Sequence, residues 1–421
     1  MKNKYIVLRE AYDWLSIGNS EDEITMLQYS ILCRYLKDNN LNNAVIYGYN
    51  KLKFINFVGI IAAGDLVIEI LPKISLTNDV IKDREMLIFM LSKCNKISVN
   101  VNEMLKTNML KCSLIDILSK VFINKLLPEL QKGLYFEYVS KEDSLNKIKG
   151  KVLLTQNSKI NAMNKTKVYC KYDEFTENNL FNSILLRAIN YLNTLVKNNT
   201  VAKELNIARS ILSEVDDLYI TRNILNLYCL NRKNERFKEA FALAKLILEN
   251  STMDTSTGKE NGFSMLFEMN YLFEEYIGIL LKEVLDNKNT IVNTQEKAEY
   301  LLWNKNRNRN EIALKPDIVI YNDEKAEVII DTKWKAAVID NKEIYSQSDI
   351  YQMYAYITTY TECKRCILLY PKISDNNEHS IWKLKPFLGD KEILIREINL
   401  ESYSKSKEEL MALLNGQIVG L

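Results

Sequence analysis

The sequence predicts a multidomain chain of mixed α+β and α/β class. We expect an N-terminal α/β module over residues 1–100, a mainly helical middle domain over 101–255, and a C-terminal α/β domain with a mixed central sheet over 256–421. Three observations predict this. The 421 residues exceed one ordinary domain. Apolar residues recur with strand spacing near both ends and with helical spacing between them. A polar, turn-rich stretch at 250–262 separates two strongly periodic segments.

The N-terminal module is expected to mix strands and helices. Short apolar runs predict strands at residues 5–8, 45–49, 52–61 and 66–74. Apolar residues at helical spacing predict helices at residues 24–36 and 84–94. Pro72 lies near the end of the last strand, where a missing N–H is tolerated.

The middle region is predicted to be mostly helical. Broad apolar faces indicate helices at residues 113–130, 176–195, 201–215 and 236–248. Ser113 is a candidate N-cap for the first of them. Two strands are expected at residues 134–139 and 150–154, flanking a polar connection at 140–149.

The C-terminal region shows another order of elements. We expect a helix at 264–285, strands at 300–303, 313–321 and 327–334, a helix at 346–360 and a strand at 366–370. Residues 322–325 have the composition of a hairpin turn. Because a helix precedes the last strand, that strand is expected to lie parallel to a neighbour.

The charge and histidine counts narrow the chemistry. Lys+Arg number 56 against 54 Asp+Glu, so a nucleic-acid contact must come from local patches or a partner. His379 is the only histidine, and we expect it on an exposed loop. Catalysis by Ser-His-Asp or Cys-His would depend on that residue, and His-rich zinc or iron sites are excluded. The counts favour a site built from carboxylates, lysine and a hard metal ion.

The cysteines and the N-terminal segment favour a cytoplasmic protein. Seven widely spaced cysteines do not suggest a secreted disulfide framework. The pair Cys363 and Cys366 lacks the second pair that a zinc site needs. We expect neither a signal peptide nor a membrane span.

Two acids and a lysine on neighbouring strands carry the predicted chemistry. Pro316 precedes Asp317, and Asp331 is followed two residues later by Lys333. Side chains alternate along a strand, so Asp331 and Lys333 share a face, and antiparallel pairing can place Asp317 beside them. Two carboxylates suit Mg²⁺, which lowers the pKa of a water and neutralises charge on a phosphate. Lys333 would stabilise charge that develops in the transition state.

Residues in two flanking helices are expected to complete this site. Glu274 is a candidate auxiliary metal ligand from the preceding helix, and Glu275 competes with it for that role. Gln352 and Tyr356 are four residues apart on the following helix, where they can contact a phosphate or a base. Upstream, alternating basic residues are candidates for phosphate contacts: Lys305, Arg307 and Arg309.

These motifs resemble the PD-(D/E)xK (restriction endonuclease-like) superfamily, in the form that carries a QxxxY helix. The resemblance narrows to the McrC family of modification-dependent restriction systems and covers most of the chain. The segments that carry it are 69–74 (EILPKI), 149–152 (KGKV), 173–179 (DEFTENN), 269–274 (MNYLFE), 330–335 (IDTKWK), 346–352 (SQSDIYQ) and 369–371 (LYP). Compact members of the family lack a region like residues 1–100.

The resemblance implies a division of labour. McrC-like proteins cut double-stranded DNA with Mg²⁺, which Mn²⁺ can replace. A hexameric AAA+ GTPase of the McrB type reads the modified cytosine, and McrC docks on it and stimulates GTP hydrolysis. This sequence has no G-x-x-x-x-G-K-[ST] loop, so we expect no nucleotide to bind this chain alone. Two alternatives stay open: a RecB-like DNA repair nuclease, and a non-cutting adaptor that activates an NTPase ring.

Overall fold

The structure is a computed structural model. It describes residues 3–73, 79–97, 109–253, 260–285, 290–339, 342–373, 379–385 and 389–414. The chain divides into two compact units, Met1–Lys111 with Met265–Leu421, and Cys112–Ser264. The first unit therefore joins both ends of the chain, while the three consecutive domains stay a prediction. None of the helices in the described ranges combines the length and apolar character needed to cross a membrane.

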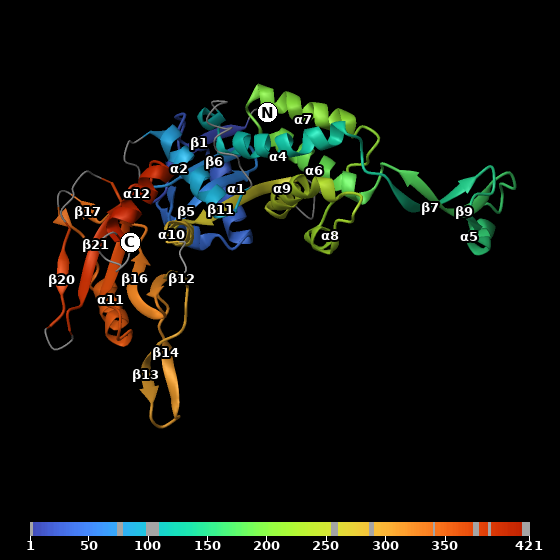
Figure 1. Cartoon of the computed structure of the whole chain (residues 1–421). Coiled ribbons are helices and arrows are strands. Elements are labelled where there is room, and N and C mark those ends of the chain that lie inside the picture. Colours follow the sequence, from blue (N-terminus) through green and yellow to red (C-terminus); the bar gives the residue numbers. More distant parts are fainter. Residues whose placement is uncertain are drawn as a thin grey trace. The chain divides into compact units, whose positions relative to one another are not determined.

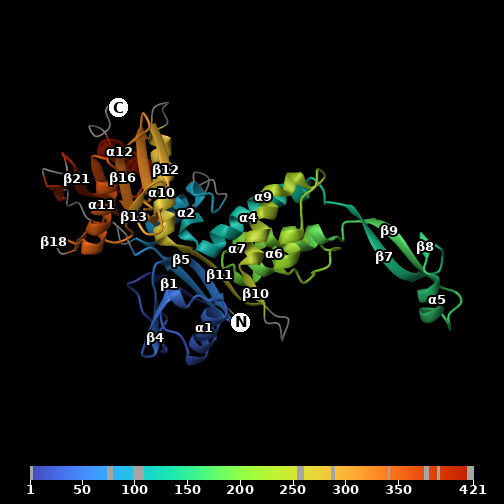
Figure 2. The same ribbon diagram turned by 90° about the horizontal axis from the view of Figure 1, so that it is seen from below.

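The N-terminal part of the first unit is a sheet with a helix and a smaller sheet packed on it. β6 (Leu66–Leu71) pairs parallel with β1 (Lys4–Arg9) and antiparallel with β5 (Phe57–Ala63). Apolar residues of α1 (Met26–Asp38) and of β4 (Lys51–Phe54) share one core with these strands, and Figure 2 shows both elements on the same side of β1 and β5. The small sheet also contains β2 (Leu15–Ser16) and β3 (Val45–Gly48), and α2 (Val80–Lys93) contacts β6.

The next strand of the main sheet returns from much later in the chain. β5 lies beside β11 (Glu260–Glu268), whose residues from Met265 onward belong to the first unit. Gly59 has a φ of +130°, and a Cβ there would stand 2.0 Å from the Met265 carbonyl oxygen. The approach of these two backbones therefore requires glycine.

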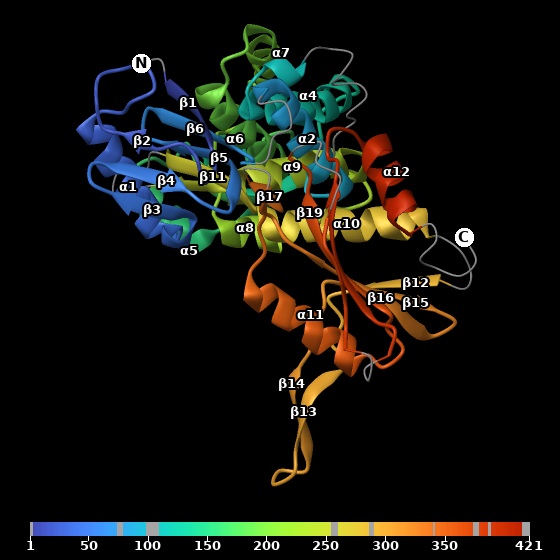
Figure 3. The same cartoon turned by 90° about the vertical axis from the view of Figure 1, so that its left-hand side faces the viewer.

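A six-stranded mixed sheet forms the C-terminal part of the first unit. Its strands in order are β12 (Thr290–Thr294), β15 (Ile318–Asn322), β16 (Lys325–Thr332), β19 (Arg365–Pro371), β21 (Glu392–Ile398) and β20 (Ile381–Lys383). β19 lies parallel to β16 and to β21, which confirms the predicted parallel crossover. α11 (Gln347–Thr359) covers one face, and Figure 3 shows α10 (Met269–Val284) and α12 (Tyr403–Leu414) on the other.

Two small ribbons accompany this sheet. β13 (Tyr300–Asn304) and β14 (Arg309–Ala313) form a two-stranded sheet of their own, which projects beyond α11 in Figure 3. β17 (Val338–Ile339) pairs with β18 (Lys342–Glu343).

The second unit consists of a helical body and a long arm. The packed helices are α4 (Leu114–Gln131), α6 (Leu180–Leu195), α7 (Asn199–Ile211) and α9 (Lys238–Glu249), with the short α8 (Arg222–Leu227) against α9. The predicted N-cap is confirmed, since the Ser113 side chain accepts a hydrogen bond from the Asp116 N–H. In Figure 1 the arm extends from this body, built from β7 (Glu137–Leu145), β8 (Lys151–Val152), β9 (Val168–Thr176) and α5 (Leu154–Ile160).

Several predicted elements were wrong because strand pairing over long distances replaced local preference. The polar connection predicted at 140–149 lies mostly in β7, which pairs along its length with β9, a strand that was not predicted. The polar stretch at 250–262 contains β10 (Ser251–Met253) and the start of β11, with residues 254–259 outside the described ranges. The side chains of β7 are exposed or half-buried along the whole strand, so β7 lacks the apolar alternation by which a strand with one buried face is predicted.

Candidate active site

A β-hairpin brings the two predicted aspartates together. β15 and β16 are antiparallel with Ile318 opposite Ile330, so Asp317 and Asp331 both lie at the same end of the hairpin. The turn residues Asp323 and Glu324 have φ values of 47° and 66°, as left-handed two-residue hairpin turns require. The predicted turn at 322–325 is therefore confirmed.

Asp317 is held by the end of the neighbouring strand. Its Oδ2 accepts hydrogen bonds from the Thr332 N–H at 2.7 Å and from the Thr332 Oγ1 hydroxyl at 2.9 Å. Burial raises the pKa of Asp317, while these two bonds and the nearby lysines oppose the rise. Asp317 is thus fixed in place with one oxygen used for support.

Asp331 and Lys333 form a close, mostly buried ion pair. Asp331 is 1% exposed, and the Lys333 Nζ lies 2.5 Å from its Oδ2. Burial, and then the charge of Asp317, raise the pKa of Asp331 to about 7, although Lys333 favours the ionised form. Burial alone would lower the pKa of Lys333, but the two aspartates raise it above its usual value. Both aspartates therefore lie close to the partly buried Lys333 ammonium group.

A third carboxylate reaches the cluster from α10. Glu274 is 9% exposed and accepts a hydrogen bond from the Gln295 side chain. Burial and the charge of Asp317 raise the pKa of Glu274 to about 7. Glu275 instead pairs with Lys96 at 2.8 Å, with 40% of its side chain exposed. Of the two competing glutamates, Glu274 is therefore the one that lies beside the aspartates.

Gln295 is a site residue that the sequence did not suggest. It follows β12, a strand that was not predicted, and its N–H donates to the Asp317 carbonyl oxygen at 2.9 Å. Its position depends on β12 pairing with β15. No local motif marks such a residue, because the pairing alone brings it to the cluster.

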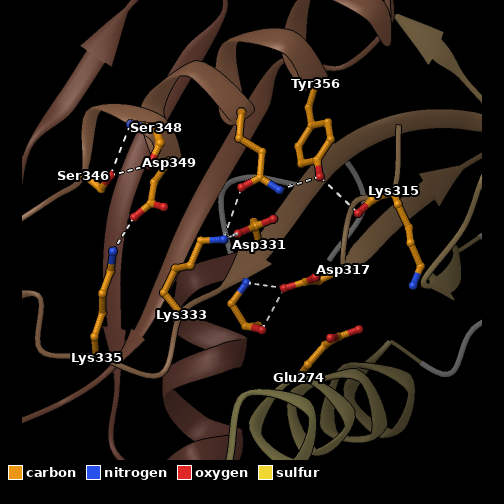
Figure 4. A network of polar contacts seen from close by, with 12 residues as sticks. Glu274, Lys315, Asp317, Asp331, Lys333, Lys335, Ser346, Ser348, Asp349 and Tyr356 are labelled. Carbon is orange, nitrogen blue, oxygen red and sulfur yellow. Dashed lines mark hydrogen bonds and ion pairs between the residues drawn. The ribbon is translucent and has the colours of Figure 1, made fainter. Parts of the chain in front are cut away.

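The helix after the sheet supplies a polar network that ends on Lys333. The Lys333 Nζ donates to Gln352 Oε1 at 3.2 Å, and Gln352 Nε2 donates to the Tyr356 hydroxyl at 2.7 Å. That hydroxyl donates to the Lys315 carbonyl oxygen at 3.0 Å (Figure 4). Gln352 and Tyr356 therefore join the amine of the site to the segment that carries Asp317.

The three predicted basic residues lie apart from the carboxylates, on the β13–β14 ribbon. Lys305, Arg307 and Arg309 are exposed at or beside its turn. Arg307 and Arg309 both lie within 3.2 Å of the Glu311 carboxylate. The ribbon connects to the cluster through the chain itself, since β14 ends four residues before Asp317.

Comparison with known proteins assigns the chain to a family. Residues 52–371 match the family model described as McrBC 5-methylcytosine restriction system component. The chain belongs to the McrBC family. No curated protein matches it by sequence.

Two solved structures share the fold of this McrBC-family chain. One is a refined half-complex from the tetradecameric assembly of Thermococcus gammatolerans McrB AAA+ hexamers with bound McrC. It matches with a TM-score of 0.73 and 18% identity, over 98% of this chain and 100% of the other. The second is the T. gammatolerans McrBC complex, at a TM-score of 0.50 and 20% identity, over 68% and 89% of the two chains.

The carboxylates provide the donor type that a hard divalent cation needs. Asp317, Asp331 and Glu274 offer only oxygen donors, and burial disfavours their charged forms, so a cation there would relieve an electrostatic cost. Within the described ranges, no three Asp, Glu, Cys or His side chains are set for metal binding. Mg²⁺ requires only one or two carboxylates because it keeps several waters. The aspartate pair therefore fits Mg²⁺, with Glu274 as an auxiliary.

The remaining candidates of this family member lie elsewhere. His379 lies outside the helices and strands, as predicted, but its predicted exposure was wrong: the side chain is 8% exposed and lies between Glu343 and Glu397, at 3.4 and 3.2 Å. Cys363 and Cys366 are buried free thiols. Burial and then Cys363 raise the pKa of the Cys366 thiol, and the charge of Asp331 adds to that rise.

Proposed function

We propose that this chain is the Mg²⁺-dependent DNA endonuclease subunit of an McrBC-type, modification-dependent restriction system. The observation that carries the proposal is the meeting of Asp317, Asp331 and Lys333 at one end of the β15–β16 hairpin, with Glu274 beside them. Three acids around one amine are costly to bury unless they bind a cation. In a McrBC-family chain, hydrolysis of a DNA phosphodiester is the reaction that uses such a site.

Each residue has a distinct task in this reaction. Asp317 and Asp331 would hold Mg²⁺ or Mn²⁺, with Glu274 as a further oxygen donor. When bound, the cation neutralises phosphate charge and acidifies a water. Lys333 places a positive charge where the phosphate gains negative charge. Gln352 holds the Lys333 ammonium through the 3.2 Å hydrogen bond, and Tyr356 fixes Gln352.

The β13–β14 ribbon supports a contact with duplex DNA. A near-neutral chain needs a local basic feature for phosphate binding, and this ribbon presents exposed cations at its turn. We propose that Lys305, Arg307 and Arg309 contact the DNA backbone beside the site. Such contacts position the duplex without reading its sequence.

A partner would supply site recognition and nucleotide hydrolysis. The T. gammatolerans structure contains McrC bound to McrB AAA+ hexamers. We propose that this chain likewise docks on a hexameric AAA+ GTPase, which reads the modified cytosine, and stimulates it. The arm of the second unit is the candidate docking element, because it presents large apolar side chains to solvent: Ile148, Leu154, Ile160 and Met163.

One substitution tests both halves of the proposal. Asp331→Ala should abolish cleavage of modified DNA in the presence of Mg²⁺, GTP and the partner, while stimulation of GTP hydrolysis stays at the wild-type level. If Asp331→Ala cuts as well as the wild type, the site assignment is wrong. If the wild type stimulates GTP hydrolysis but never cuts, the chain is an adaptor. Cutting of DNA ends without GTP would indicate a repair nuclease.

The neighbouring glutamates on α10 provide a matched pair. Glu274→Ala should slow cleavage and raise the Mg²⁺ concentration that is needed, because it removes an oxygen donor beside Asp317. Glu275→Ala removes a surface pair with Lys96 and should leave both quantities unchanged. Equal behaviour of the two variants would remove Glu274 from the site.

A further inference from the structure

A buried glutamate marks the end of the first strand, far from the predicted site in sequence. Glu10 follows β1 and is 0% exposed. Its N–H donates to the Leu71 carbonyl oxygen at 3.0 Å, which continues the pairing of β1 with β6. A glutamate is seldom fully buried unless specific partners compensate its charge. The partners of Glu10 therefore show what its burial serves.

Its side-chain partner belongs to the catalytic segment. The Trp334 Nε1–H donates to Glu10 Oε1 at 2.6 Å. Trp334 is 3% exposed and directly follows Lys333. The Lys333 N–H, in turn, donates to the Leu369 carbonyl oxygen at 2.9 Å, where the pairing of β16 with β19 ends. The segment after Asp331 is thus anchored on one side by β19 and on the other by Glu10.

The other groups around Glu10 come from the N-terminal part of the unit. Backbone N–H groups of Lys73 and Asn56 face its carboxylate, as does the charge of Lys73. Burial raises the pKa of Glu10, and these donors oppose that rise. The Asn56 carbonyl oxygen accepts a hydrogen bond from the Met269 N–H at 2.8 Å, at the first residue of α10. Asn56, which lies beside Glu10, therefore also contacts the helix that carries Glu274.

The indole of Trp334 makes a second link to that helix. Its ring centroid lies 5.4 Å from the ring of Phe273, which is 0% exposed and directly precedes Glu274. Trp334 therefore lies between the segment that carries Lys333 and the helix that carries Glu274. Lys333 directly precedes Trp334 in the chain, and Glu274 directly follows Phe273. A shift of the indole would move both.

We propose that Glu10 is a positioning residue for cleavage: through the Trp334 indole it fixes Lys333 and Glu274 relative to the two aspartates. The inference rests on the proposed nuclease function and assigns a task to the N-terminal module. That module holds the catalytic segment in register, so cleavage requires β1 and the Lys73 segment to be docked. Glu10 does not touch the substrate.

Three variants test the hydrogen bond itself. Trp334→Phe keeps an aromatic ring against Phe273 but removes the N–H, and Glu10→Ala removes the acceptor. Each should lower kcat for DNA cleavage by about 10- to 100-fold, because small displacements at a reacting centre cost that much. DNA affinity should stay unchanged. Glu10→Gln retains an acceptor oxygen and should recover part of the loss seen in Glu10→Ala.

A double variant separates positioning from general damage. If the two residues act through one bond, Glu10→Ala combined with Trp334→Phe should cleave no more slowly than the worse single variant. Trp382→Phe is the matched control, since Trp382 packs against Tyr345 away from the cluster and should keep wild-type kcat. Multiplying losses in the double variant, or full activity of folded Glu10→Ala, would overturn the proposal.

A measurement without cleavage keeps this inference separate from the proposed function. Hydrogen–deuterium exchange of the peptide over residues 330–335 should be faster in Glu10→Ala than in the wild type. If the wild type does not cut DNA and the exchange still rises, the nuclease function fails and the anchoring stands. Unchanged exchange in Glu10→Ala would refute the anchoring, whatever the activity.

Discussion

Among the buried carboxylates of the first unit, Glu69 and Asp331 are compensated differently. In the N-terminal sheet, Glu69 is 0% exposed and meets Arg84 with both oxygens, one of them at 3.0 Å from Nη2. The Tyr5 hydroxyl donates to it as well. In the C-terminal sheet, Asp331 pairs with Lys333, and the same lysine also interacts with the charge of Asp317. The first carboxylate is matched by its own cation, and the second is not.

This difference in charge compensation distinguishes a carboxylate buried for stability from one buried in a candidate site. A paired and fully hydrogen-bonded carboxylate is stable in place, and removing it leaves an uncompensated cation. A buried carboxylate with a raised pKa and too few neighbouring positive charges destabilises the fold. A bound metal ion would supply the missing positive charge. Burial alone therefore identifies neither kind of site.

The largest effect is expected at the N-terminal pair. Glu69→Ala leaves the Arg84 guanidinium buried without its acceptor and should lower the free energy of unfolding by about 3–5 kcal/mol. Denaturant unfolding of the variant and wild type measures this. A loss below about 1 kcal/mol would mean that the pair is not a structural element, and the contrast with Asp331 would fail.

The second effect is expected at Asp331, where a substitution should raise the free energy of unfolding. Asp331→Asn keeps the shape of the side chain but removes its charge, so cleavage should fall by about 10²–10³-fold. The free energy of unfolding should rise by on the order of 1 kcal/mol near pH 8, because a costly buried charge is gone. Cleavage assays and denaturant unfolding at the same pH test both statements. A variant that is both inactive and strongly destabilised would make Asp331 a structural residue like Glu69.

The third effect is a pH dependence to which the C-terminal cluster contributes. The pKa values of Asp331 and Glu274 are raised to about 7, above those of the unfolded chain. The folded protein therefore keeps protons that the unfolded chain releases, and the metal-free protein should lose stability as the pH rises from about 4 through about 7. Bound Mg²⁺ competes with these protons, so its thermal stabilisation should be larger at about pH 8 than at about pH 6. Equal shifts at both values would contradict the raised pKa values.

The smallest effect is expected at the ribbon. Replacing Lys305, Arg307 and Arg309 by Ala should make the slope of log K against log salt for DNA binding shallower, by at most about 3. The change should be smaller than that limit, because Glu311 already neutralises part of the charge. A matched control removes three lysines that have acidic partners on the arm: Lys141, Lys149 and Lys171. An equal change in the control would show that the ribbon has no special role.

The sequence by itself determined the proposed reacting groups and the local elements that hold them. One histidine and the spacing of Asp317, Asp331 and Lys333 restricted the chemistry, because a hairpin with period-two side chains can be predicted from the 17 residues between Asp317 and Lys333 inclusive. The tertiary structure decided what depends on pairing between distant segments. It chose Glu274 over Glu275, added Gln295 through β12, and brought Glu10 to Trp334. Gln295 and Glu274 are 21 positions apart in the chain, and Glu10 and Trp334 are 324 apart, so no local periodicity records these contacts.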